Sequence, residues 1–238
     1  YWYALTGNIF EIPTPYLEAD LPTLNIVQSG DIIVITHQNY PVRELSRTGH
    51  TAWTLVLTTF APSIAAPTGL SVSGAAGTTD QWVVTSIKTD SYEESLQSSA
   101  VRANSLASSG SPRTISWTAN PAAFEYNVYK NSNGVYGFVG VAVGTSFVDD
   151  GIPADTTDTP PQARNPFPSA THYPATASYY QQRLGFANTI AEPEKCWFSK
   201  SANFRNFTTS APLQDDDAVT FNVAGRRVNS IQQLLDLG

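Results

Sequence analysis

The sequence predicts an all-β protein made of many short strands, with one β-sandwich inserted into a second, discontinuous β part. Charged residues make up only 14% of the 238 residues, against about 25% in an ordinary soluble domain. The chain instead contains 26 Thr and 23 Ser, and Thr favours strands. Short apolar or alternating segments separated by Gly, Pro and Asn recur along the chain, as is typical of strands joined by turns.

Residues 1–60 form the first predicted β part. The segments 1–3 and 9–12 flank a Gly-Asn turn signal and predict a hairpin. The run 31–36 is apolar without alternation after its first residue, so we expect an inner strand covered on both faces. Segment 53–57 alternates large residues and closes this part.

Residues 61–150 are predicted to form a sandwich of roughly 90 residues. Small residues and Pro at 61–67 indicate a linker that leads into it. Short strand-like segments then follow, with an Asn-Gly turn signal before the last of them, at 70–72, 82–87, 115–117, 126–129 and 139–143.

Residues 151–238 form the third predicted part. Six prolines within 151–175 predict an extended connection without a core of its own. Strands are expected again at 180–186, 196–199 and 218–223. The apolar spacing in 228–237 indicates a helix, and a strand followed by a turn stays open as the alternative.

A loose internal repeat relates the first and third parts. The order Gln28, Pro41, Trp53 parallels Gln182, Pro193, Phe207, and repeated units of short strands are typical of propeller blades. Chance similarity between two β segments is the alternative. The repeat predicts propeller-like blades interrupted by the sandwich. We expect these large aromatic residues to lie in blade or sandwich cores: Trp53, Trp117, Tyr180, Trp197, Phe204 and Phe207.

Composition also argues against several classes of partner. The 13 Lys and Arg against 20 Asp and Glu give a net charge of −7, which argues against a nucleic-acid-binding surface. The single Cys196 excludes an internal disulfide. The apolar runs are far shorter than the roughly 20 residues of a membrane-spanning helix. Met is absent and the chain starts with Tyr1, so we expect it to be part of a longer protein.

Two groups of residues are candidates for metal binding. His37 and His50 with Asp31 have the side chains of a zinc or iron site, although their spacing does not place them on one strand face. The acidic run 215–217 resembles a calcium site but lacks the Gly and Glu of a calcium loop. We interpret both groups as structural or solvent-facing and predict no metal or cofactor.

The candidate catalytic residues likewise do not form a complete catalytic motif. Cys196 lies beside Lys195, which would lower a thiol pKa, but we interpret Cys196 as a small buried apolar residue. The carboxylate pairs 93–94 and 192/194 have the residue types of a glycosidase, and loop carboxylates are usually solvated. Residues 206–208 fit the N-glycosylation pattern. We assign no catalytic residue and predict that the protein is not an enzyme.

Two stretches, one in the first part and one in the third, contain distinctive short motifs. The first stretch contains Glu-Ile-Pro-Thr-Pro-Tyr at 11–16 and Gln-Ser-Gly-Asp at 28–31. The second contains Thr-Pro-Pro at 159–161, Tyr-Gln-Gln-Arg-Leu at 180–184 and Trp-Phe-Ser at 197–199. Together the two stretches cover roughly 60% of the chain, and they resemble tail hub or nozzle proteins of short-tailed phages and prophages.

The middle part contains Pro-Thr-Gly-Leu at 67–70, Ile-Ser-Trp at 115–117 and Tyr-Asn-Val-Tyr at 126–129. These segments resemble the entry strand and the central strands of a fibronectin type III domain. The segment 82–98 resembles the final hairpin of that domain but precedes the Trp117 strand, so we expect a permuted sandwich.

The phage resemblance implies a structural virion protein of the tail, made in the cytoplasm of the bacterial host. It implies a homo-oligomeric ring that contacts adjacent tail or adaptor proteins and tail fibres or spikes. Phage DNA would pass through as non-specific cargo, for which a negative charge is suitable. The alternative is a non-catalytic β-sandwich module that binds a glycan or a protein in a receptor-binding or adhesion protein.

Overall fold

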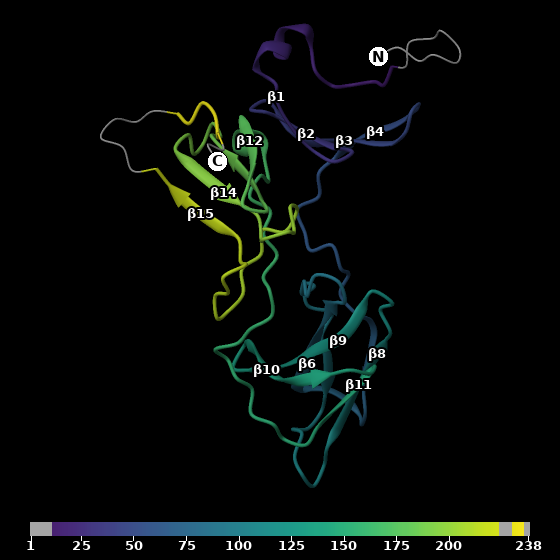
Figure 1. Cartoon of the computed structure of the whole chain (residues 1–238). Coiled ribbons are helices and arrows are strands. Elements are labelled where there is room, and N and C mark those ends of the chain that lie inside the picture. The colour runs from purple at the N-terminus through teal and green to yellow at the C-terminus, as the bar shows by residue number, and fades with distance from the viewer. Residues whose placement is uncertain (1–10, 224–229, 236–238) are drawn as a thin grey trace. The chain divides into compact units, whose positions relative to one another are not determined.

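The computed structural model describes residues 11–223 and 230–235 (Figure 1). Over these residues the protein is all-β, as predicted, with fifteen strands in four antiparallel sheets and two short 3-10 helices. The chain divides into two compact units. The first comprises Tyr1–Phe60, Asn165–Arg205 and Ala218–Gly238, and the second comprises Ala61–Arg164 and Asn206–Asp217. The part expected at 151–238 therefore contributes to both units.

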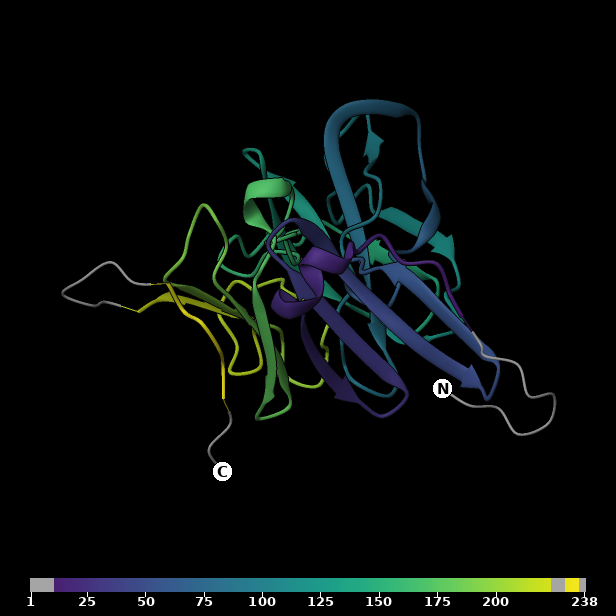
Figure 2. The same ribbon diagram turned by 90° about the horizontal axis from the view of Figure 1, so that it is seen from above.

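The first sheet of the first unit is a four-stranded antiparallel meander with the order β1-β2-β3-β4 (Figure 2). It follows the short helix η1, Glu18–Thr23. The strands are β1 Asn25–Ser29, β2 Ile32–His37, β3 Tyr40–Gly49 and β4 Ala52–Leu57. Consecutive residues Val34 and Ile35 are 1% and 8% exposed. The predicted inner strand, covered on both faces, is confirmed.

The second sheet of the first unit is another four-stranded meander, with the order β12-β13-β14-β15. A short helix η2, Ala170–His172, precedes it. The strands are β12 Thr176–Tyr180, β13 Arg183–Ala187, β14 Lys195–Phe198 and β15 Val219–Asn222.

The strand predicted at 180–186 is wrong at its start. Tyr180 ends β12 and pairs with Arg183 across a two-residue turn. Gln181 and Gln182 form this turn with φ of 44° and 60°, in a conformation that Gly and Asn usually adopt. The missing Gly signal explains why the sequence did not indicate a hairpin here.

The two meanders pack together through their first strands, β1 and β12. The side-chain oxygen of Asn25 accepts the Ala177 N–H at 2.9 Å, and the Thr36 hydroxyl donates to the Ala175 carbonyl at 3.2 Å. Arg205 also forms a bidentate ion pair with Glu44, which is 3% exposed. Charge-assisted bonds of this kind fix the orientation of the segments they join.

Aromatic rings fill the core beside the second meander. The Phe167 ring lies 5.0 Å from Phe186 and 5.4 Å from Trp197, and Phe60 lies 5.8 Å from Phe186. All three contacts are edge-to-face, the arrangement that aromatic pairs prefer. The Pro-rich connection is irregular, as predicted, but it supplies Phe167 to this core.

The second unit is a sandwich of one four-stranded and one three-stranded sheet, with orders β10-β9-β6-β7 and β11-β8-β5. The strands are β5 Thr68–Val72, β6 Ala76–Lys88, β7 Val101–Ala103, β8 Arg113–Thr118, β9 Ala123–Ser132, β10 Val135–Ala142 and β11 Ser146–Asp149. Its core includes Trp82, Ile115, Trp117, Tyr126 and Val128.

The antiparallel pair β6 and β7 comes early in the sandwich. It follows β5, an edge strand of the three-stranded sheet, and precedes β8, the strand of Trp117. Because β6 pairs with β7 and β9, the hairpin that the sequence placed before Trp117 is built into the four-stranded sheet.

Several of the aromatic assignments need correction. Tyr180 is 45% exposed and lies outside the core. Trp53 is only half-buried, against Arg47. Phe207 is 1% exposed but belongs to the second unit, not to a blade. Phe204 is half-buried against Tyr179. Trp197 and Trp117 are buried, as predicted.

Two further expectations concern segments at the ends of the predicted parts. The linker 61–67 is packed, since Ile64 is 4% exposed. Residues 230–235 contain no helix, so that part of the helix expected at 228–237 is wrong. The rest of that helix and nearly all of the hairpin expected at 1–12 lie outside the described residues.

Candidate functional site

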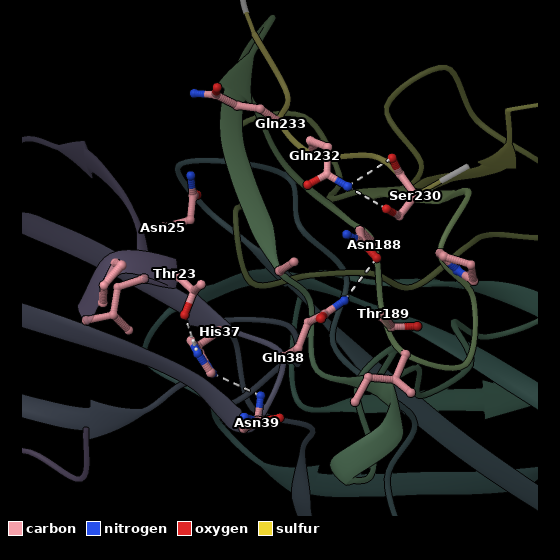
Figure 3. Close-up of a pocket in the computed structure, with 15 residues that line it drawn as sticks. Thr23, Asn25, His37, Gln38, Asn39, Asn188, Thr189, Ser230, Gln232 and Gln233 are labelled. Carbon is pink, nitrogen blue, oxygen red and sulfur yellow. Dashed lines mark hydrogen bonds between the residues drawn. The ribbon is translucent and has the colours of Figure 1, made fainter. Parts of the chain in front are cut away.

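A cleft of about 840 Å³ lies within the first unit (Figure 3). We call it the amide cleft because six of its side chains are carboxamides. These are Asn25, Gln38, Asn39, Asn188, Gln232 and Gln233. The other lining residues are 22–24, 37, 175, 189, 190, 193 and 230.

The turn between β2 and β3 supplies one wall. The Asn39 N–H donates to Nδ1 of His37 at 3.1 Å, so the ring proton lies on Nε2. Nε2 then donates to the Thr23 hydroxyl at 2.8 Å, and that hydroxyl donates to the Asp20 carbonyl at 3.0 Å. His37 is 6% exposed, so this chain of hydrogen bonds holds its ring in one orientation.

The opposite wall follows β13. Asn188 has a φ of 61° and is 6% exposed, and its side-chain oxygen accepts a bond from Gln38 at 3.0 Å (Figure 3). Thr189 caps the next turn by accepting the Glu192 N–H at 3.0 Å. The Gln38–Asn188 bond thus connects the two walls.

The lining of the amide cleft offers both donors and acceptors without a formal charge. Gln38 uses its NH₂ group and keeps its oxygen for a ligand, whereas Asn25 uses its oxygen and keeps its NH₂ group. No Asp, Glu, Lys or Arg occurs among the described lining residues. The chemistry therefore favours a neutral polyhydroxylated or amide-containing ligand over an ionic one.

The three residues considered for a metal site are not brought together. His37 lies in the amide cleft, whereas Asp31 and His50 each contact Arg47, at 3.5 and 3.0 Å. Within the described part of the chain, no three His, Cys, Asp or Glu side chains are close enough to hold a metal ion.

The considered carboxylate pairs are divided between separate partners. Glu93 accepts bonds from Ser63 and Asn206, whereas Glu94 accepts bonds from Thr85, Asn127 and Tyr129. Burial raises the pKa of Glu94, against the lowering effect of its three donors. In the other pair, Glu192 binds Lys195 at 2.5 Å. Glu93 and Glu94 therefore serve separate structural contacts, whereas the acid and nucleophile of a glycosidase flank one bond.

The remaining candidates have structural surroundings. Cys196 is 3% exposed, and burial raises the pKa of its thiol, which disfavours the nucleophilic thiolate. Asp217 accepts bonds from Ser210 and Gln214 and closes its own loop. Asn206 is 2% exposed and is therefore inaccessible for glycosylation in the folded protein.

The sequence did not single out the amide cleft. Its residues are spread from position 22 to position 233, and isolated Asn and Gln residues carry no motif. The one available signal is positional: Gln38–Asn39 and Asn188–Thr189 both come directly after strands that are buried on both faces.

Comparison with models of known protein families found no match, and comparison with curated proteins found no significantly similar sequence. The phage-tail resemblance therefore stays a prediction. Among the described residues, no helix has the length and apolar character needed to cross a membrane.

Proposed function

We propose that the protein is a non-enzymatic structural component of a phage tail, a hub or nozzle protein that forms a homo-oligomeric ring. The observation that carries the proposal is the pairing of two four-stranded meanders through their first strands. Successive propeller blades are four-stranded sheets arranged in this order, radially around an axis. The meanders correspond to the two stretches that resemble the tail proteins.

The outer strands of the two meanders support a role in assembly. On β4, Val56 and Leu57 are 50% and 55% exposed, and on β15, Val219 and Phe221 are 45% and 47% exposed. Exposed apolar side chains that cluster on strands are typical of surfaces that another protein surface covers. In the proposed ring, further β-sheets or adjacent tail proteins cover these strands.

The net charge of −7 agrees with a conduit. A protein that must let DNA pass gains nothing from phosphate contacts, which produce affinity. The proposed location is the virion, after synthesis in the bacterial cytoplasm.

The proposal is tested by the mass of the particles that the full-length protein forms in solution, and by its presence in purified virions. Phe221→Asp should lower the particle mass to that of a monomer, because it places a charge on the outer strand. Val148→Asp is the matched control, since Val148 is 55% exposed on β11 of the second unit. A wild-type protein that is monomeric and absent from virions would overturn the proposal.

The amide cleft supports a second candidate function, the binding of a neutral glycan. Carboxamides and hydroxyls are suitable partners for sugar hydroxyls, and the lining carries no competing charge. We expect Gln38→Leu to abolish binding on a glycan array, while Gln97→Leu, at an exposed position of the second unit, leaves it unchanged. An array without reproducible wild-type binding refutes this candidate.

A further inference from the structure

A lysine lies between two buried carboxylates in the sandwich. Lys130 on β9 has its Nζ 3.0 Å from Oδ2 of Asp149 and 3.4 Å from Oδ2 of Asp80. The side chains of these residues are 12%, 0% and 2% exposed, in the order Lys130, Asp149, Asp80. The Trp82 ring, with its centroid 5.8 Å from Nζ, covers the ammonium group. This arrangement places an amine and two carboxyl groups together with little access for water.

Hydrogen-bond donors contact both oxygens of the Asp149 carboxyl group, and this arrangement favours nucleophilic attack at its carbon. Its Oδ1 accepts the N–H groups of Gly151 and Ile152, each at 2.9 Å. Its Oδ2 accepts the indole N–H of Trp82 at 2.9 Å. Two backbone donors on one oxygen stabilise the negative charge that develops there when a nucleophile attacks the carbon.

Asp80 is placed to transfer protons. Its Oδ2 is within 3.4 Å of the same amine and accepts the Ala107 N–H at 3.0 Å. It can take a proton from the attacking nitrogen and return it to the leaving oxygen.

The reaction needs the protonated acid at Asp149. Burial opposes ionisation of Asp149, but the bonds from Lys130, Gly151, Trp82 and Ile152 outweigh it and lower its pKa. The protonated acid is therefore the minor form. A reaction that occurs once per molecule needs only that minor form, because the groups are permanently in contact.

We propose that Lys130 and Asp149 form an intramolecular isopeptide bond after folding. The neutral Nζ attacks Cγ of the protonated Asp149, and the new C–N bond creates a tetrahedral intermediate with its oxyanion on Oδ1. Asp80 takes the proton from Nζ and delivers it to the Oδ2 hydroxyl, which leaves as water when the C–O bond breaks. The product is an amide plus one water molecule, and no oxidant or co-reactant is consumed.

The bond would connect the two sheets of the sandwich. Lys130 belongs to the four-stranded sheet, and Asp149 ends β11 of the three-stranded sheet. The only cysteine, Cys196, lies in the other unit, so the sandwich has no disulfide with which to link its sheets. A covalent link of this kind stabilises by restricting the unfolded chain.

The experiment is intact-mass spectrometry of the purified protein, followed by peptide mapping. The wild-type mass should be lower than the sequence mass by one water, and digestion should yield a branched peptide that joins Lys130 to Asp149. Lys130→Arg keeps the charge and should show the full sequence mass. Asp149→Asn should lose ammonia in place of water, because the leaving group changes. Asp80→Asn should slow or stop the loss of water.

Three results would overturn the proposal. The first is a folded wild-type protein that keeps the full sequence mass after prolonged incubation, which would make the cluster an ion pair only. The second is a loss of water that persists in Lys130→Arg, which would indicate a succinimide at Asp150-Gly151. The third is a branched peptide that joins Lys130 to Asp80. The wild-type mass decides the question even if a variant fails to fold.

Discussion

Glu93 connects three separate segments of the second unit, and replacing it with Ala should destabilise that unit strongly. Glu93 is 3% exposed. Its Oε2 accepts the Ser63 N–H at 3.0 Å and hydroxyl at 2.5 Å, and its Oε1 accepts the Asn206 NH₂ group at 2.8 Å. The carboxylate thus holds the segment 206–217 and the chain entry at Ser63 against the sandwich.

The size of the loss in unfolding free energy depends on whether the former partners of Glu93 can form hydrogen bonds with water instead. Asn206 is 2% exposed, so its orphaned donor costs the full desolvation penalty of about 1–3 kcal/mol. Ser63 is exposed and can bond to water, so its loss is about 1 kcal/mol. The missing side-chain atoms leave a cavity that adds about 1 kcal/mol. We expect Glu93→Ala to lower the free energy of unfolding by about 3–5 kcal/mol.

The assay is urea-induced unfolding followed by tryptophan fluorescence. Gln97→Ala is the matched control because Gln97 lies in the same segment and is exposed; it should change the free energy of unfolding by less than about 0.5 kcal/mol. A loss below about 1 kcal/mol for Glu93→Ala would show that the buried carboxylate does not hold these segments together.

Four further perturbations test other parts of the fold. Gln182→Gly should stabilise by about 0.5–1 kcal/mol, seen as a higher Tm, because it relieves a left-handed conformation; a lower Tm would contradict this. Gly185→Ala should cost about 1–3 kcal/mol, because its Cβ would lie 2.5 Å from the Phe198 ring; a neutral effect in urea unfolding would exclude this close packing. Trp117→Ala should lower the free energy of unfolding by about 3–5 kcal/mol in the same assay. A loss below about 1 kcal/mol would show that Trp117 does not lie in the core. Burial raises the pKa of Glu94, so the folded state binds its proton more tightly than the unfolded state does, and the free energy of unfolding should fall as the pH rises from about 4.5. Glu94→Gln should flatten this fall in urea titrations at several pH values. If the variant keeps the same pH dependence, Glu94 is not its cause.

The strand pattern of this protein is readable from local sequence where side chains alternate or cluster. The inner strand β2 was predictable because the run 32–35 is apolar on successive positions, which only a strand covered on both faces tolerates. The sequence also indicated that the β6–β7 hairpin precedes β8, because the strand-like segment with Trp82 comes before the segment with Trp117. The hairpin at Gln181–Gln182 was not, because tertiary packing imposes a turn that those residues do not favour locally.

The candidate sites depend on contacts that local sequence does not encode. Lys130 and Asp80 lie on the neighbouring strands β9 and β6 of one sheet, and Asp149 reaches them from the facing sheet. The residues of the amide cleft are separated by up to 211 positions, from Pro22 to Gln233. Conversely, residues that are adjacent in the sequence can have different partners. Glu93 and Glu94 are an example, because adjacent residues of an extended chain face opposite ways.

The proposed assembly of this protein into a ring of a phage tail can be checked by negative-stain electron microscopy of the purified full-length protein. We expect closed rings of uniform diameter and cyclic symmetry. Isolated particles of monomer size, under conditions in which the protein is folded, would contradict it.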